Sequence, residues 1–104
     1  MSTKLYSVII DFSDRSGAVE QFRTETHLEA LKQFIETSEA LNGFDRGQLM
    51  TTMGTNPFLH VKGLNGVWLI VLSPECINVK GPNDYIVLGG YVIQTDPEAP
   101  MGKD

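Results

Sequence analysis

The stretch from Thr26 to Gly43 constrains the fold most, because it carries the signals of one amphipathic helix with a defined start and end. Thr26 and Glu29 have the spacing of a capping box: the threonine hydroxyl accepts from the Glu29 amide, and the carboxylate reaches back to the Thr26 amide. Asn42-Gly43 predicts the end of the helix. Between them the apolar residues recur at helical spacing, with Ser38 as the one polar break: Leu28, Leu31, Phe34, Ile35 and Leu41.

A helix of this length is only marginally stable alone in water, so its apolar face is expected to be buried against a sheet. Lys4–Phe12 has apolar residues on both faces of an alternating pattern, which is typical of a central strand. Ser13–Gly17 is a turn cluster of hairpin length. The more polar Ala18–Thr24 predicts a returning strand at the sheet edge. The chain therefore begins strand, strand, helix.

The structure of residues 44–57 is left open by the sequence. Phe44–Met53 fits a short helix carrying Leu49, Met50 and Met53, but Gly47 in its first turn weakens the helix. A loop or an irregular strand is the alternative.

The second half of the chain predicts strand after strand. Phe58–Val61 is short, Val67–Leu72 is a continuous apolar run typical of a buried strand, and Cys76–Lys80 is short again. Tyr85–Thr95 predicts the last strand, with a bulge or bend at Gly89-Gly90. The expected fold is α+β: an antiparallel sheet of five or six strands, a meander in its second half, with one main amphipathic helix packed on one face.

A chain of 104 residues is long enough for one domain with a core of its own. We expect residues 1–95 to form this single domain and residues 96–104, which are rich in proline and polar residues, to form a disordered tail. A monomer is favoured. A homodimer is the alternative, because Tyr85–Thr95 as a terminal strand would present an unprotected edge.

The chain is acidic, with thirteen Asp and Glu against eight Lys and Arg and a formal net charge of −5. Such a charge disfavours binding to nucleic acid or to an anionic membrane. Cys76 is the single cysteine, which excludes an internal disulfide and fits a reducing compartment. Neither a secretory leader nor an apolar stretch of membrane-spanning length is recognisable, so a cytoplasmic protein is expected.

The inventory of reactive side chains favours a protein that is not an enzyme. His27 is expected at the surface of the first helical turn, His60 at a sheet rim, and Trp68 in the core. Neither a nucleophile with an orienting base, nor a set of closely spaced metal ligands, nor a phosphate-binding glycine loop is present in the sequence. No cofactor is therefore expected. A small-molecule site with His60, Tyr85 and Tyr91 as polar groups remains a lesser alternative.

The acidic residues are concentrated around the predicted helix, where residues 25–45 contain five acids and only one lysine, Lys32. We hypothesise that Glu29, Glu36, Glu39 and Asp45 contribute to a docking surface for a basic protein, because opposite charge steers association. The competing interpretation is a solvated helix face without a partner.

The first forty or so residues also contain a recognisable order of motifs. Residues 6–12 read Tyr-Ser-Val-Ile-Ile-Asp-Phe, a tight turn follows, the next strand passes through Gln21-Phe22-Arg23, and residues 28–35 read Leu-Glu-Ala-Leu-Lys-Gln-Phe-Ile. This order resembles the opening of small bacterial immunity proteins, the antidotes encoded beside contact-dependent growth-inhibition and related polymorphic toxins. The Gly-Gly-Thr turn and helical Trp of one such group are replaced here by Ser16-Gly17 and Phe34.

The resemblance implies a protein that binds and blocks a cognate toxin domain, often a nuclease, in a tight complex. An acidic antidote suits a basic nuclease, because it can occupy the surface meant for phosphates. Interfaces in such proteins diverge quickly, so the resemblance assigns no binding residue. The alternative is a small regulatory or structural subunit of a larger bacterial assembly.

Overall fold

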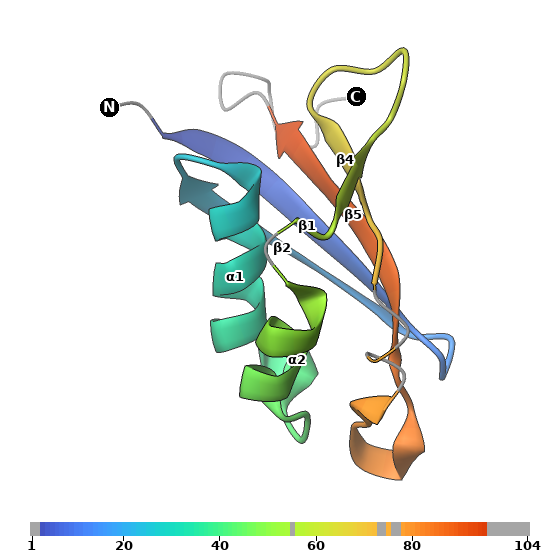
Figure 1. The fold of residues 1–104 in the computed structure, drawn as a ribbon. Helices are drawn as coiled ribbons and strands as arrows, with labels where there is room; N and C mark the ends of the chain where they lie inside the picture. The colour runs from blue at the N-terminus through green and yellow to red at the C-terminus, as the bar shows by residue number, and fades with distance from the viewer. Residues whose placement is uncertain (1–2, 55, 73–74, 76–77, 96–104) are drawn as a thin grey trace.

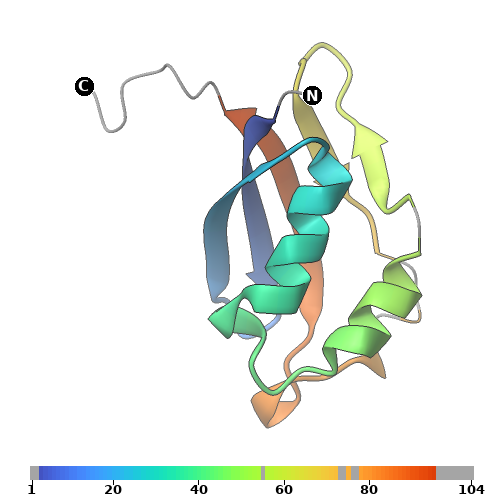
Figure 2. The same ribbon diagram turned by 90° about the vertical axis from the view of Figure 1, so that its left-hand side faces the viewer.

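The computed structural model describes residues 3–54, 56–72, 75 and 78–95, and these form two layers (Figure 1). Both α-helices lie on the same side of the sheet (Figure 2). Within the described residues the strands form one antiparallel sheet of five, in the order β2-β1-β5-β4-β3. The α+β fold with its main helix on one sheet face is thereby confirmed. The elements are β1 (Lys4–Phe12), β2 (Gly17–Thr24), α1 (His27–Thr37), η1 (a 3-10 helix, Glu39–Leu41), α2 (Arg46–Met53), β3 (Phe58–His60), β4 (Val67–Ile70), η3 (a 3-10 helix, Pro82–Asp84) and β5 (Val87–Thr95).

The first hairpin has the predicted arrangement. β1 is an interior strand between β2 and β5, and β2 is an edge strand. Alternation along β1 sends every second side chain into the core beneath the helices: Tyr6, Val8, Ile10 and Phe12 are buried. These side chains pack with Ala30, Leu31, Phe34 and Ile35 of α1 in one hydrophobic cluster.

Helix α1 begins as predicted but ends earlier. The Thr26 hydroxyl accepts from the Glu29 amide at 3.2 Å, and the Glu29 carboxylate accepts from that hydroxyl rather than from the Thr26 amide. The helix ends at Thr37, because Ser38 adopts an extended conformation and its side chain caps η1. Ser38 is fully buried, so the polar break in the apolar stripe is the point where the chain changes direction. Asn42-Gly43 ends η1 instead of α1.

Of the two alternatives that the sequence left open for Phe44–Met53, the structure contains the short helix, α2. Asp45 is the N-cap of α2 and accepts from the Gln48 amide, which compensates for the glycine in the first turn. Leu49 and Met53 are buried, and Met50 is half-buried.

Strand β5 differs from its predicted position. It lies in the centre of the sheet, with β1 on one side and β4 on the other, so the predicted free edge of Tyr85–Thr95 is wrong. A bulge was predicted at Gly89-Gly90, and one lies immediately before this pair: Asp11 pairs with Gly89 and Phe12 with Val87, which leaves Leu88 as the extra residue. A homodimer through a β5 edge is therefore excluded, because both of its edges are occupied within the chain.

The prediction of a fully buried strand at residues 67–72 is also wrong. β4 ends at Ile70, its only buried residue, while Val67, Trp68 and Leu69 are half-buried and Val71 is exposed. The reason is that the helices cover one face of the sheet, so alternate residues of the apolar run face away from the core.

Two further predictions concern residues outside the described part. Of the strand expected at Cys76–Lys80, residues 76 and 77 are not among the described residues; Val79 is buried, and Lys80 forms a single bridge with Ile86. The expected tail, residues 96–104, also lies outside the described residues. In the described part of the chain no helix has the length and apolarity needed to cross a membrane.

Gly90 is the position where the sheet least tolerates a side chain. Its φ is +156°, and a Cβ atom there would lie 1.8 Å from the Ile9 carbonyl oxygen of β1. Gly90→Ala is expected to lower the free energy of unfolding by about 3 kcal/mol or more, because β5 must move away from β1. Chemical denaturation measures the change.

Gly47→Ala is the matched control for this substitution. Gly47 lies in the first turn of α2, where the nearest atom to an added Cβ is 3.6 Å away. Alanine is the better helix former there, so stability should rise by roughly 0.5–1 kcal/mol. Equal effects of the two substitutions would contradict the close approach of β5 to β1.

Candidate functional site

The outer surface of the helix layer contains two grooves that share the Lys32 and Glu36 side chains of α1. We call the first the apolar groove; it lies between α1 and α2 and has a volume of about 490 Å³. We call the second the polar groove; it lies between α1 and the end of β2, with a volume of about 570 Å³. Lys32 and Glu36 lie on successive turns of α1 and form one exposed ridge. Helix α1 therefore supplies one wall of each groove.

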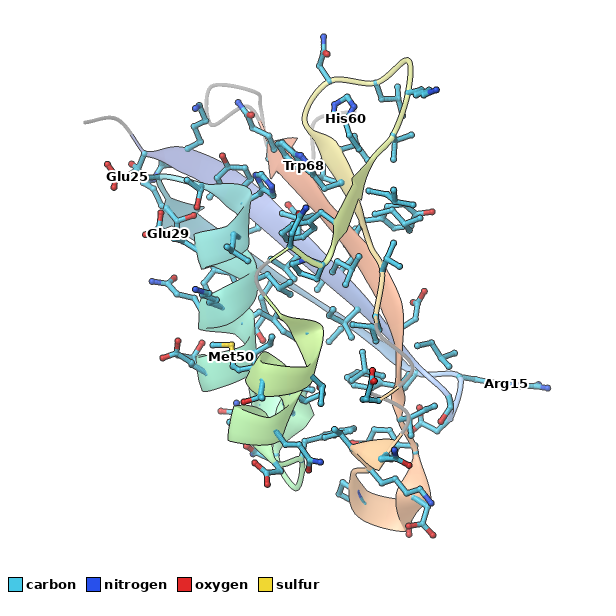
Figure 3. The ribbon with its side chains drawn as sticks, in the orientation of Figure 1. Arg15, Glu25, Glu29, Met50, His60 and Trp68 are labelled. Atoms are coloured by element: carbon cyan, nitrogen blue, oxygen red, sulfur yellow. The ribbon has the colours of Figure 1, made fainter. Side chains whose placement is uncertain are left out.

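The apolar groove is formed by side chains at the margin of the core. Leu31 and Ile35 are buried at its floor, and the half-buried Leu28 lies on α1. Met50 of α2 lies at the α1–α2 boundary (Figure 3). Methionine side chains adapt to irregular partners, so this lining suits an inserted apolar side chain of another protein.

The polar groove brings three carboxylates together, from Glu25, Glu29 and Glu36. Glu25 and Glu29 lie close together at the start of α1 (Figure 3). Two cations, Arg23 and Lys32, also border this groove, so its charge is mixed rather than purely acidic.

The four predicted docking residues are all exposed but do not form one cluster. Glu29 and Glu36 border the polar groove. Glu39 lies beyond the end of α1 in η1, and Asp45 lies at the start of α2. They are separated because the helix ends at Thr37, whereas the prediction placed Glu39 on the same helix. Glu25 is the acid that the prediction of the docking surface missed, although it precedes the capping box directly.

Two of these four acids have local structural roles. Glu29 takes part in the cap of α1, and Asp45 caps α2 by accepting from Gln48 at 3.0 Å. Within the described part of the chain, Glu36 and Glu39 have no side-chain hydrogen bond of this kind. Reversing the charge of Glu36 and Glu39 should therefore leave the fold intact, since exposed charges contribute little to stability.

His27 lies in an aromatic cluster instead of at the open surface predicted for it. Its ring stacks on Trp68 with the centroids 3.9 Å apart and an angle of 6° between the planes. Phe58 meets the His27 ring edge-on at 4.7 Å, and Tyr6 lies 6.5 Å away. Burial lowers the pKa of His27. A position in the first helical turn disfavours the imidazolium further, because the positive end of the helix dipole lies there.

The three polar residues considered for a small-molecule site lie on different elements. His60 is exposed on β3, with its ring 6.5 Å from Trp68. Tyr85 packs edge-on against Phe12 and Phe44, and Tyr91 points away from the helix layer. Among the described residues, no group of three or more His, Cys, Asp or Glu side chains could hold a metal ion.

A comparison of the chain with protein-family models, curated proteins and solved structures finds no match. The likeness to immunity proteins therefore stays a prediction from the sequence.

The His27 stack predicts a pH dependence of stability. The folded-state pKa lies below the unfolded value of about 6.5, so the unfolded chain binds the proton more readily. The stabilisation is present above about pH 6.5 and is lost as the pH falls from there through the lower folded-state pKa. His27→Gln should flatten this loss of unfolding free energy between about pH 7 and about pH 5.

His60→Gln is the control for this experiment, because it removes the exposed histidine and leaves the stack in place. Urea denaturation at several pH values compares the slopes, and the control should keep the slope of the unaltered chain. An unfolding free energy that rises as the pH falls, and does so only when His27 is present, would contradict the prediction. It would show that attraction of the imidazolium to the Trp68 ring outweighs burial.

Proposed function

We propose that this protein is an immunity protein that binds a cognate bacterial toxin domain through the outer surface of its helix layer. The observation that supports this most is the apolar groove between α1 and α2, bordered by the exposed charged ridge of Lys32 and Glu36. An apolar pocket with a charged rim is the common arrangement of a protein-binding surface.

In this proposal the two grooves have different roles in binding the toxin. The apolar groove receives an apolar side chain of the toxin, and exclusion of water from that contact slows dissociation. Glu25, Glu29 and Glu36 lie beside it and attract a basic surface, which speeds association. The toxin expected from this surface presents an apolar anchor flanked by Lys or Arg. A nuclease domain, whose active surface is basic, meets that requirement.

The neighbouring gene discriminates between the immunity proposal and its alternatives. An adjacent gene for a large protein ending in a toxin domain supports immunity, whereas a metabolic operon favours a regulatory or structural subunit. Co-expression of that terminal domain with this chain in a bacterial host should restore growth that the domain alone prevents. Continued growth arrest with both proteins present would contradict the proposal.

Charge reversal tests the electrostatic part of the proposal. Glu36→Lys with Glu39→Lys should slow association with the toxin domain at least about tenfold at low salt, while dissociation changes less. For the unaltered chain, the association rate should fall as salt rises toward about 0.5 M. Stopped-flow kinetics against the purified, catalytically inactivated toxin domain measures both effects.

A matched pair of single substitutions separates the helix ridge from net charge alone. Glu36→Lys and Asp84→Lys change the net charge equally, but Asp84 is an exposed residue of η3, outside both grooves. Glu36→Lys should slow association more than Asp84→Lys. Equal slowing would show that only the overall charge matters and that another surface makes the contact.

Substitution of Met50 tests the apolar groove through the dissociation rate, whereas charge steering acts mainly on the association rate. Met50→Lys places a long cationic side chain at the wall of the groove, and the dissociation rate of the toxin complex should rise at least about tenfold. Met50→Leu conserves volume and apolarity, so it should change that rate little. Surface plasmon resonance measures both, with thermal unfolding as the check on the fold. Unchanged dissociation for Met50→Lys would place the anchor elsewhere.

A further inference from the structure

The face of the sheet opposite the helices carries an apolar row that crosses every strand. The register pairs Val19 of β2 with Ile9 of β1, Ile9 with Tyr91 of β5, Tyr91 with Leu69 of β4, and Leu69 with Leu59 of β3. Directly paired residues of neighbouring strands point to the same face. Each strand thus contributes one large apolar side chain to a continuous row on the helix-free face.

Three of the five side chains of the row are exposed, whereas Ile9 and Leu69 are half-buried. Val19 is 62% exposed, Leu59 57% and Tyr91 42%. Ile93 and Val67 pair directly beside the row and extend it along β5 and β4. Beside the row, Gln21 of β2 donates to the Ser7 hydroxyl of β1, which also bonds Thr95 of β5, so this part of the face is polar. The solvated face of a two-layer antiparallel sheet is normally polar throughout, so an apolar row that crosses all five strands indicates a surface that is covered in use.

Among the described residues, the strands carry little charge on the same face. Along the strands, alternation places only Asp11 of β1 and Arg23 of β2 there, and Arg23 on its edge strand also borders the polar groove. Asp11 and Arg23 lie at opposite ends of the β1–β2 pair, since Asp11 pairs with Gly17 and Arg23 with Leu5. The described strands therefore give this face no net charge, although the whole chain carries −5.

We propose that a second copy of this chain covers this face, so that two sheets pack face to face. Electrostatics favours this occupant in two ways. Two molecules of charge −5 repel each other least through the neutral face, with the acids of α1 on the far sides. A twofold axis that runs across the strands also brings the Asp11 end of each copy over the Arg23 end of the other, which makes the face complementary to itself.

The size of the face is sufficient for a weak dimer. Five strands about 4.8 Å apart, with about 20 Å of strand length, give roughly 500 Å² on each copy. Two such faces bury about 1,000 Å², which is near the lower limit for a specific interface. The sheets would pack about 10 Å apart and about 30° from parallel, as in a β-sandwich. The helix-layer grooves remain open in this arrangement, so it does not rest on the proposed toxin binding.

Sedimentation equilibrium of the purified chain, from about 1 µM to about 500 µM, tests the proposal. The mass should rise with concentration toward twice the 11.5 kDa of the single chain. Leu59→Glu with Tyr91→Glu should raise the dimer dissociation constant at least about tenfold, because charges would be buried opposite apolar side chains. Leu64→Glu is the control: Leu64 is 53% exposed but lies in the loop after β3, so dimerisation should persist.

Charge swapping tests the orientation of the two copies. Asp11→Arg alone and Arg23→Asp alone should each weaken the dimer several-fold, and the double swap should restore it, because opposite charges face each other again. A chain that stays monomeric at every concentration overturns the proposal, as does a dimer that survives Leu59→Glu with Tyr91→Glu. Equal dissociation constants for both single swaps and the unaltered chain overturn the twofold arrangement. Far-ultraviolet circular dichroism of each variant verifies the fold.

Discussion

The pairing of β5 with β1 holds the two halves of this chain together. β1, β2 and α1 come from the first part of the sequence, whereas β3 and β4 reach the sheet only through β5. The backbones approach so closely at Gly90 that no side chain fits between that residue and Ile9. β1 pairs with one side of β5 and β4 with the other. The contact that positions β5 against β1 therefore also sets the register of β4. The apolar row on one face and the helix layer on the other follow from that register.

The elements that sequence patterns predicted are those whose signals are local. β1 and its hairpin follow from alternation and a turn cluster, and the start of α1 follows from Thr26 and Glu29 only three residues apart. The errors concern contacts between distant residues. The last strand in the sequence became the central strand of the sheet, and no local pattern encodes that order. α1 ends early because Ser38 is buried and caps η1. A single polar residue in an apolar stripe does not by itself predict such an end.

The sequence predicted which acidic residues of the candidate site are exposed, but not how they are arranged in space. The exposed positions of Glu29 and Glu36 follow from the helical periodicity of α1, and Glu39 and Asp45 are also exposed although they lie outside that helix. Their grouping was not predictable, because it required the true end of α1 and the position of α2 beside it. The apolar groove combines α1 with Met50 and Met53 of a helix that the sequence left open. The stack of His27 on Trp68 joins residues 41 positions apart and has no sequence signal.

The two faces of the sheet impose opposite requirements on any partner. The helix layer presents carboxylates beside an apolar groove, so a partner there gains both steering and an anchor when it is basic. The opposite face offers large apolar side chains with little charge, so it favours a partner surface that is also apolar. Salt should therefore affect the two associations differently: it would weaken contact with a basic partner and, by screening the repulsion between two acidic chains, strengthen contact between copies. A dimer built through the sheet face would then present two helix layers on opposite sides, each open to its own partner.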